Sequence, residues 1–439
     1  MPFVCDCRAY FCLVFELRSC SLLCFLCKGL IGSTVFTQLL TLATRQRSSQ
    51  AAPLPTNVAP LGLYNLGKTC FLNCILQVSF LNNPCLQRFF LSSGHASHEF
   101  SLKNEAKVLD LWTNISTLTE EIQSECIACL FDLLFQSYAI NSASLRPSSS
   151  SSSPKQPAII TSPMAVPISP TSLLCSLWNL TATCSSSISA DIYDVHPGPD
   201  LTGYLQQDAH EAYICLLSRL HSALSVRNNF VKNDPCSCII HDVFGGKLAS
   251  TISCPACGYS STTYDSFLDL SLAISIPSLG PLSLIKSIEH FLSPEHIDDS
   301  CPNYSLGKCS GSPKLGSGGL LKSFKLTKLP QTLCLHLKRF EHSKDSARKI
   351  DTLINFPLQI DMRSFIDEPM AKIYYEYSLL GVILHSGSIN SGHYTSFVRV
   401  GETWFKADDS SITQVSVESI HSSNPYILFY IQRAHDTSG

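Results

Sequence analysis

The feature that most constrains this chain is one cysteine, Cys70, set between a glycine-rich turn and an apolar helical run in GLYNLGKTCFLNCILQ, residues 62–77. Backbone N–H groups at the start of a helix stabilise a thiolate. The pattern therefore predicts a reactive thiol whose pKa lies below the ~8.5 of a free cysteine.

A nucleophilic cysteine needs a base, and HSGSINSGHYTSFVRVGETWFKADDSS, residues 385–411, supplies one in His393. Two acids, Asp408 and Asp409, follow in the same segment. A cysteine early in a chain, with a histidine and an acid late in it, is typical of a Cys-His-Asp site that folding assembles.

Three segments carry a resemblance to a known family. Residues 62–77 and 385–411 are similar to the Cys box and the His box of the ubiquitin-specific proteases, and YLQQDAHEAYICLL, residues 204–217, is similar to their QQD box. The resemblance covers roughly residues 60–435. Within it, residues 236–435 are similar to the histone-directed enzymes carried by the SAGA coactivator complex.

Helical patterns precede strand patterns along the chain, which indicates an α+β fold. Apolar spacing predicts helices over Cys70–Leu81, residues 104–137 and Gln206–Leu224. Alternating, β-branched and aromatic residues predict strands at 332–342, 377–387, 393–400 and 426–433. The resemblance implies a papain-like cysteine peptidase with a helical thumb, a β palm and β fingers that hold zinc.

The catalytic domain is predicted to span residues 61–435, after a linker at 46–60. Within it, residues 142–172 are rich in serine and proline and are interpreted as a disordered insertion. Residues 1–45 contain several cysteines but no histidine. They are interpreted as a truncated or degenerate remnant of the zinc finger with which the relatives begin, or as a disordered segment.

The resemblance assigns a role to each member of the catalytic set. Cys70 attacks the carbonyl carbon of the C-terminal glycine of ubiquitin, and His393 holds the thiolate and then protonates the leaving lysine amine. Asp408 orients His393, with the adjacent Asp409 as a second candidate. Asn65 matches the oxyanion-hole residue, and one such donor is worth roughly 3–4 kcal/mol.

The QQD box and the His box are expected to bind the ubiquitin tail. Asp208 and Glu211 share one face of the predicted helix, where their carboxylates can pair with the arginines of the tail. The alternative is a solvated acidic face. The resemblance also implies tail contacts from Gln207, His385, Gly392 and Tyr394.

Cys254 and Cys257 have the spacing of a zinc knuckle. In close relatives a second Cys-x-x-Cys completes the site, but here Ser312 stands where the cysteine after Cys309 is expected. Cys301 can complete the set if the loop folds back. We therefore expect one structural zinc ion on these four cysteines, and no cofactor for catalysis.

Bulk composition restricts the partners and the compartment. A net charge of −3 does not favour non-specific binding to nucleic acid, so a link to chromatin must come through partners or substrate. The 21 cysteines do not form a compact secreted framework and favour a reducing compartment, the nucleus with the cytoplasm as a second location. Charged residues interrupt the apolar stretch at 11–43, so we expect no membrane anchor.

The sequence thus predicts a deubiquitinase, a thiol-dependent hydrolase that removes ubiquitin from protein lysines. The subfamily likeness adds monoubiquitinated histone as a substrate and the adaptors of a SAGA-like module as partners. The alternative is a non-catalytic, ubiquitin-binding scaffold subunit of a coactivator complex. The presence of Asn65, Cys70, His393 and Asp408 favours the enzyme.

Overall fold

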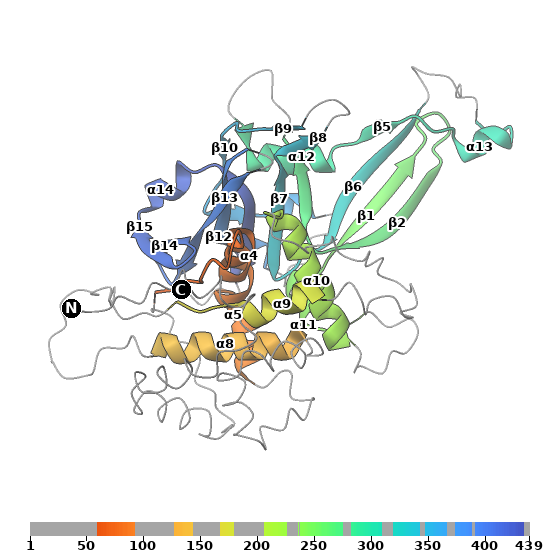
Figure 1. Cartoon of the computed structure of the whole chain (residues 1–439). Helices are drawn as coiled ribbons and strands as arrows, with labels where there is room; N and C mark the ends of the chain where they lie inside the picture. Colours follow the sequence, from red (N-terminus) through yellow and green to blue (C-terminus); the bar gives the residue numbers. More distant parts are fainter. Residues whose placement is uncertain are drawn as a thin grey trace, which may run out of the picture. The chain divides into compact units, whose positions relative to one another are not determined.

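The structure is a computed structural model that describes residues 59–92, 127–143, 167–179, 206–225, 236, 238–274, 282–309, 319–342, 347–366, 374–388 and 391–433 (Figure 1). The chain divides into two units, Met1–Ala52 and Pro53–Gly439, and every described residue belongs to the second. The predicted finger remnant, most of the linker and most of the predicted helix at 104–137 lie outside the described residues. Among the described helices, none has the length and apolar character needed to cross a membrane.

The helices surround the cysteine box. Helix α4 (Cys70–Ile75) continues as a π-helix, η1 (Leu76–Leu81), and every residue of both is buried. The next helix starts where the Asn83 side chain accepts hydrogen bonds from two backbone N–H groups and Pro84 occupies the first turn. The other helices of this layer are α5 (Pro84–Leu91), α8 (Ile127–Ala143), α9 (Thr171–Asn179), α10 (Ala209–Ser225) and α11 (Ile239–Phe244).

The largest sheet has the strand order β15-β14-β13-β12-β16-β7-β3, with β11 paired to β12. Neighbouring strands are antiparallel except for the parallel pair β3 and β7. The neighbouring strands β16 and β7 are buried along nearly their whole length, which explains their near-continuous apolar sequences. The strands are β3 (Leu270–Ala273), β7 (Thr332–Lys338), β11 (Gln359–Asp361), β12 (Glu376–Gly387), β13 (Gly392–Val400), β14 (Thr403–Asp408), β15 (Ser411–Val415) and β16 (Pro425–Gln432).

A second sheet has the order β2-β1-β6-β5. Strand β2 is exposed on both faces except at Phe267, in keeping with its polar sequence SSTTYDSF. The strands of this second sheet are β1 (Gly246–Ser253), β2 (Ser260–Phe267), β5 (Glu295–Ile297) and β6 (Leu320–Lys328). The remaining elements are β4 (Leu282–Ser283), α12 (Leu284–Leu292), α13 (Pro302–Ser305), β8 (Phe340–His342), β9 (Ala347–Lys349), β10 (Ile354–Asn355), η3 (Arg363–Phe365) and α14 (Val417–His421).

The cysteine box lies between the helices and the large sheet. The π-helix η1, which continues from the cysteine box, packs so closely on β12 that a Cβ at Gly381 would overlap the Val78 side chain and the Phe397 carbonyl. On the other side, Phe80 contacts Phe131 of α8 with ring centroids 4.9 Å apart. The fold therefore clamps the nucleophile-bearing segment between two apolar surfaces.

The predicted α+β architecture is confirmed, and the predicted strands lie close to β7–β8, β12, β13 and β16. The helix predicted from Gln206 begins three residues later, at Ala209. Most of the predicted insertion at 142–172 lies outside the described residues. At its described ends, α8 reaches Ala143 and Ile168 forms a β-bridge with Leu63.

We expect Gly381→Ala to lower the free energy of unfolding by about 1–3 kcal/mol, because the added methyl group overpacks the contact between η1 and β12. Thermal denaturation with circular dichroism measures this effect. Gly319→Ala is the control, since its Cβ would approach only the Ile297 carbonyl, at 3.3 Å. Equal stability of the Gly381→Ala variant and the parent would contradict this packing.

Candidate active site

Cys70 is the first residue of α4, and only 3% of it is exposed. Its Sγ accepts a hydrogen bond from the backbone N–H of Tyr394 at 3.5 Å. Tyr394 directly follows His393 in β13. Folding thus brings the early cysteine to the strand that carries the late histidine.

His393 is held by the acid at the end of the adjacent strand β14. The His393 Nε2 lies 2.7 Å from Asp408 Oδ1, and Lys406 Nζ donates to Asp408 Oδ2 at 3.1 Å. Burial alone would raise the pKa of Asp408, but these two hydrogen bonds outweigh it and lower the pKa. Asp408 is therefore ionised near pH 7 and fixes the ring of His393.

The sequence analysis did not identify Lys406 as part of the site. The signal was present, because residues two apart in a strand point to the same face, and Lys406 precedes Asp408 by two in β14. The lysine satisfies the carboxylate oxygen that His393 leaves open.

The electrostatics of Cys70 differ from the expectation drawn from the sequence. Burial raises the pKa of the Cys70 thiol, the Tyr394 N–H offsets part of that rise, and the nearby charge of Asp409 adds to it. The expected lowering of the pKa was wrong, because the loss of solvent outweighs the N–H groups at the helix start. The thiol is protonated at neutral pH in this arrangement.

We expect the rate of Cys70 alkylation by iodoacetamide to keep rising with pH to beyond pH 9, because burial raises the pKa of the thiol. Peptide-resolved mass spectrometry separates Cys70 from the other cysteines, and Cys70→Ala identifies the peptide signal. A rate that already levels off near pH 6–7 would show a thiolate at rest and contradict the raised pKa.

Asn65 is fixed by Asp409. The Asn65 Nδ2 donates to Asp409 Oδ2 at 2.8 Å, and its Oδ1 accepts from the backbone N–H groups of Gly67 and Thr69. Asn73 donates to the other Asp409 oxygen, also at 2.8 Å. Because an amide carries two N–H donors, Asn65 keeps one that is not used by Asp409. The two adjacent acids thus hold different partners: Asp408 holds His393, and Asp409 holds Asn65 and Asn73.

Backbone contacts hold the turn of the two acids against the cysteine box. Asp409 has a φ of +52°, in the left-handed region, and its carbonyl accepts from Leu63 N at 2.9 Å. A Cβ at Gly62 would overlap the Ser410 carbonyl, so only glycine permits this approach. The glycine before the nucleophile therefore serves the contact between distant parts of the site.

Asp208 lies directly before α10 and not within the helix, which corrects its predicted place on one helix face with Glu211. Its Oδ1 caps the helix by accepting from the backbone N–H groups of His210 and Glu211. Its Oδ2 accepts from the hydroxyls of Tyr394 and Tyr426. Both carboxylate oxygens are thus occupied within the chain.

The first glutamine of the QQD box, Gln206, was missed by the sequence analysis. Its Oε1 accepts from the backbone N–H of Gly392 at 2.8 Å, directly before His393. A Cβ at Gly392 would overlap the ring of His385 and the Ser386 carbonyl. The glycine in SGHY thus lets β12, β13 and the QQD box meet behind His393.

The other predicted substrate-binding residues are placed around this junction. The Tyr394 side chain is buried, and its ring centroid lies 4.6 Å from that of His385. Burial lowers the pKa of His385 to about 4, so this histidine is neutral at pH 7 and is not the base of the site. Gln207 is half-buried and Glu211 is exposed, which leaves Glu211 as an accessible carboxylate on α10.

The four predicted zinc ligands come together at the fingers sheet. The Sγ atoms of Cys254 and Cys309 are 3.8 Å apart, and those of Cys257 and Cys301 are 3.6 Å apart. All four sulfurs lie within 4.8 Å of one another. A tetrahedral zinc ion with Zn–S bonds of about 2.3 Å places its sulfurs about 3.8 Å apart, so the set fits zinc.

Comparison with known proteins agrees with this geometry. Residues 61–430 match the family model described as "Ubiquitin carboxyl-terminal hydrolase". The mouse protein "Ubiquitin carboxyl-terminal hydrolase 22" is 32% identical over 408 residues, which cover 84% of this chain and 65% of that protein. The yeast "Ubiquitin carboxyl-terminal hydrolase 8" is 31% identical over 390 residues, covering 85% of this chain and 70% of that protein.

Among solved structures, this chain is similar to one chain of the SAGA Ubp8/Sgf11/Sus1/Sgf73 DUB module bound to ubiquitin aldehyde. The TM-score is 0.60 at 27% identity, covering 92% of this chain and 76% of the other. The fold and the site together define a papain-like cysteine peptidase of the ubiquitin-specific type. The chain belongs to the ubiquitin carboxyl-terminal hydrolase family, and it spans about 65% of the length of the first curated relatives it matches.

Proposed function

We propose that this chain is a thiol-dependent deubiquitinase that cleaves the isopeptide bond between ubiquitin and a protein lysine. The observation that carries the proposal is the arrangement of Cys70 beside the strand of His393, with Asp408 2.7 Å from the far ring nitrogen of that histidine. Membership of the ubiquitin carboxyl-terminal hydrolase family supports the same reaction.

The reaction proceeds in two halves. His393 takes the proton of Cys70, and the thiolate attacks the carbonyl carbon of the C-terminal glycine of ubiquitin. The free N–H of Asn65 and the backbone N–H of Cys70 donate to the oxyanion. The C–N bond then breaks as His393 gives its proton to the lysine amine, which leaves a thioester on Cys70.

Water completes the cycle. His393 removes a proton from a water molecule, which attacks the thioester carbon and releases the carboxylate of ubiquitin. The sulfur leaves and regains its proton, so the enzyme returns to its initial state. Asp408 stabilises the protonated form of His393 in both halves, because its carboxylate accepts from the ring.

The raised pKa of Cys70 affects how readily the chain reacts in the absence of substrate and partner subunits. Proton transfer to His393 is uphill when burial favours the neutral thiol. We infer that substrate or partner subunits shift this balance towards the ion pair.

We further propose that the substrates include monoubiquitinated histone, that the chain works in the nucleus and that adaptors of a SAGA-like module bind it. The similarity to Ubp8 in its complex with Sgf11, Sus1 and Sgf73 supports the adaptors. The net charge of −3 is consistent with access to chromatin through partners and not through direct contact with nucleic acid.

Zinc in the fingers belongs to the same proposal. Cys254, Cys257, Cys301 and Cys309 would hold the ion, and Cys301 takes the place expected for residue 312. The ion would join the turn after β1 to the segments on both sides of α13 and would supply no step of the reaction.

We expect Asp408→Asn to reduce kcat/KM for a fluorogenic ubiquitin amide by about 10²–10⁴-fold, because the ring of His393 loses its anionic partner. Asp409→Asn is the matched control in the adjacent position, and we expect a loss at least about tenfold smaller, since the Asp409 side chain binds Asn65 and Asn73 and not His393. A larger loss in Asp409→Asn would reverse the assignment of the two acids.

We expect the chain alone to turn over slowly and kcat to rise about tenfold or more when adaptor subunits of the module are added. The reason is that adaptors that favour the ion pair of Cys70 and His393 would make proton transfer between them easier. Steady-state hydrolysis with and without adaptors measures this. Equal turnover in both states would argue against the adaptor proposal while leaving the hydrolase itself intact. No turnover in either state would favour the scaffold alternative.

A further inference from the structure

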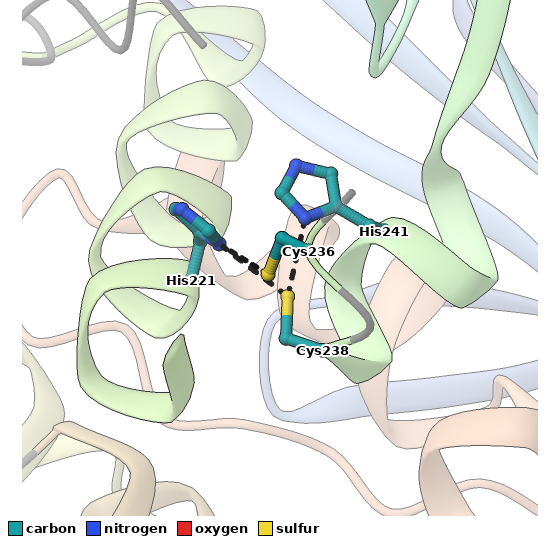
Figure 2. Close-up of side chains that lie close together, drawn as sticks. All are labelled: His221, Cys236, Cys238 and His241. Atoms are coloured by element: carbon teal, nitrogen blue, oxygen red, sulfur yellow. Dashed lines mark hydrogen bonds between the residues drawn. The ribbon is translucent and has the colours of Figure 1, made fainter. Parts of the chain in front are cut away.

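A second cluster of metal-ligating side chains joins α10 to the segment that begins α11 (Figure 2), and it shares no residue with the catalytic site or the fingers cysteines. His221 comes from the C-terminal part of α10, and His241 comes from α11. Cys236 and Cys238 lie directly before α11. Figure 2 shows the two imidazoles and the two thiols directed towards one point.

The distances within this cluster match a tetrahedral zinc site. The Cys238 Sγ lies 3.4 Å from His221 Nδ1 and 3.3 Å from His241 Nδ1, and the Cys236 Sγ lies 3.8 Å from His221 Nδ1. With Zn–S of about 2.3 Å and Zn–N of about 2.0–2.1 Å, sulfur and nitrogen ligands of one zinc ion are about 3.6 Å apart. All four ligand atoms lie within 4.8 Å of one another.

We propose that this cluster is a structural zinc site with a Cys2His2 ligand set: His221, Cys236, Cys238 and His241. Two thiolates and two imidazoles suit zinc and do not suit magnesium or calcium, which prefer oxygen ligands. Four protein ligands leave no open position, so the site is structural and not catalytic.

The state of the ligands agrees with this assignment. Cys236 and Cys238 are free thiols and form no disulfide. Each imidazole turns its Nδ1 towards the Cys238 sulfur, and this nitrogen offers the lone pair that a metal needs.

A contrasting cluster, formed by His210, Asp269 and His336, is held together by directed hydrogen bonds. His210 Nε2 is paired with Asp269 Oδ2 at 3.0 Å, and its ring stacks on His336 with centroids 3.9 Å apart. Ser271 bonds both Asp269 and His336. These side chains satisfy one another through directed hydrogen bonds, whereas the Cys2His2 cluster contains thiols, which are weak hydrogen-bond partners.

The position of the site indicates its purpose. Helix α10 begins three residues after Gln206, which binds the backbone N–H before His393, and it ends four residues after His221. Helix α11 leads through Gly245 into β1, the strand at the base of the fingers. A zinc ion here would tie the far end of the QQD helix to the start of the fingers sheet, which holds α10 in place along its length.

The test is the zinc content of the full-length chain, by elemental analysis, in the parent and in single variants. We expect His221→Ala and Cys238→Ser each to lose about one equivalent of zinc, and Cys254→Ser to lose a separate equivalent. His290→Ala is the matched control, because His290 is exposed on α12 and outside the cluster. Zinc content unchanged in folded His221→Ala and Cys238→Ser would overturn the proposal.

Cobalt substitution gives a second readout that does not depend on variants that fold poorly. We expect His221→Cys to keep the metal and to strengthen the thiolate-to-cobalt charge-transfer absorption, since a third sulfur replaces a nitrogen. A His221→Cys chain that binds no more cobalt than folded His221→Ala would contradict a metal at this position. Any metal bound by the cysteines of residues 1–45 contributes equally to every variant, so it cancels when the variants are compared.

Discussion

The catalytic arrangement depends on one backbone hydrogen bond, from the N–H of Tyr394 to the thiol of Cys70. It joins the start of an early helix to a late strand, so the nucleophile and the base meet only in the folded chain. The close packing of Val78 against Gly381 holds the helix on the sheet behind this contact. Burial of the same helix start raises the pKa of the thiol, so precise placement and a neutral resting thiol have one cause.

Two neighbouring acids position the base and the oxyanion donor. Asp408 and Lys406 fix the ring of His393, while Asp409 fixes the amides of Asn65 and Asn73. The left-handed backbone at Asp409 turns the two side chains to different partners. The base and the oxyanion donor are thereby positioned by one turn, which contacts the cysteine box through Leu63.

The sequence predicted the α+β fold and the chain order of the site because local patterns carry that information: apolar spacing, strand alternation and three motifs. It missed Gln206 and Lys406, whose roles depend on partners far away in the chain or across a strand pair. It placed Asp208 on a helix face, because spacing alone does not reveal that the side chain caps the helix. The expected low pKa of Cys70 failed for a similar reason, since burial is a property of the whole fold. The Cys2His2 cluster was also missed, because His221 comes from another helix and Cys-x-Cys is not a common zinc spacing.

The most direct test of the central claim is covalent capture by ubiquitin that carries a C-terminal alkyne electrophile, read by intact mass. The account predicts one ubiquitin adduct on the parent chain and on Cys74→Ala, which removes a buried thiol one turn along the same helix, and none on Cys70→Ala. An adduct that persists in Cys70→Ala would assign the nucleophile to another cysteine. The absence of any adduct, even with adaptor subunits present, would contradict a competent thiol at Cys70.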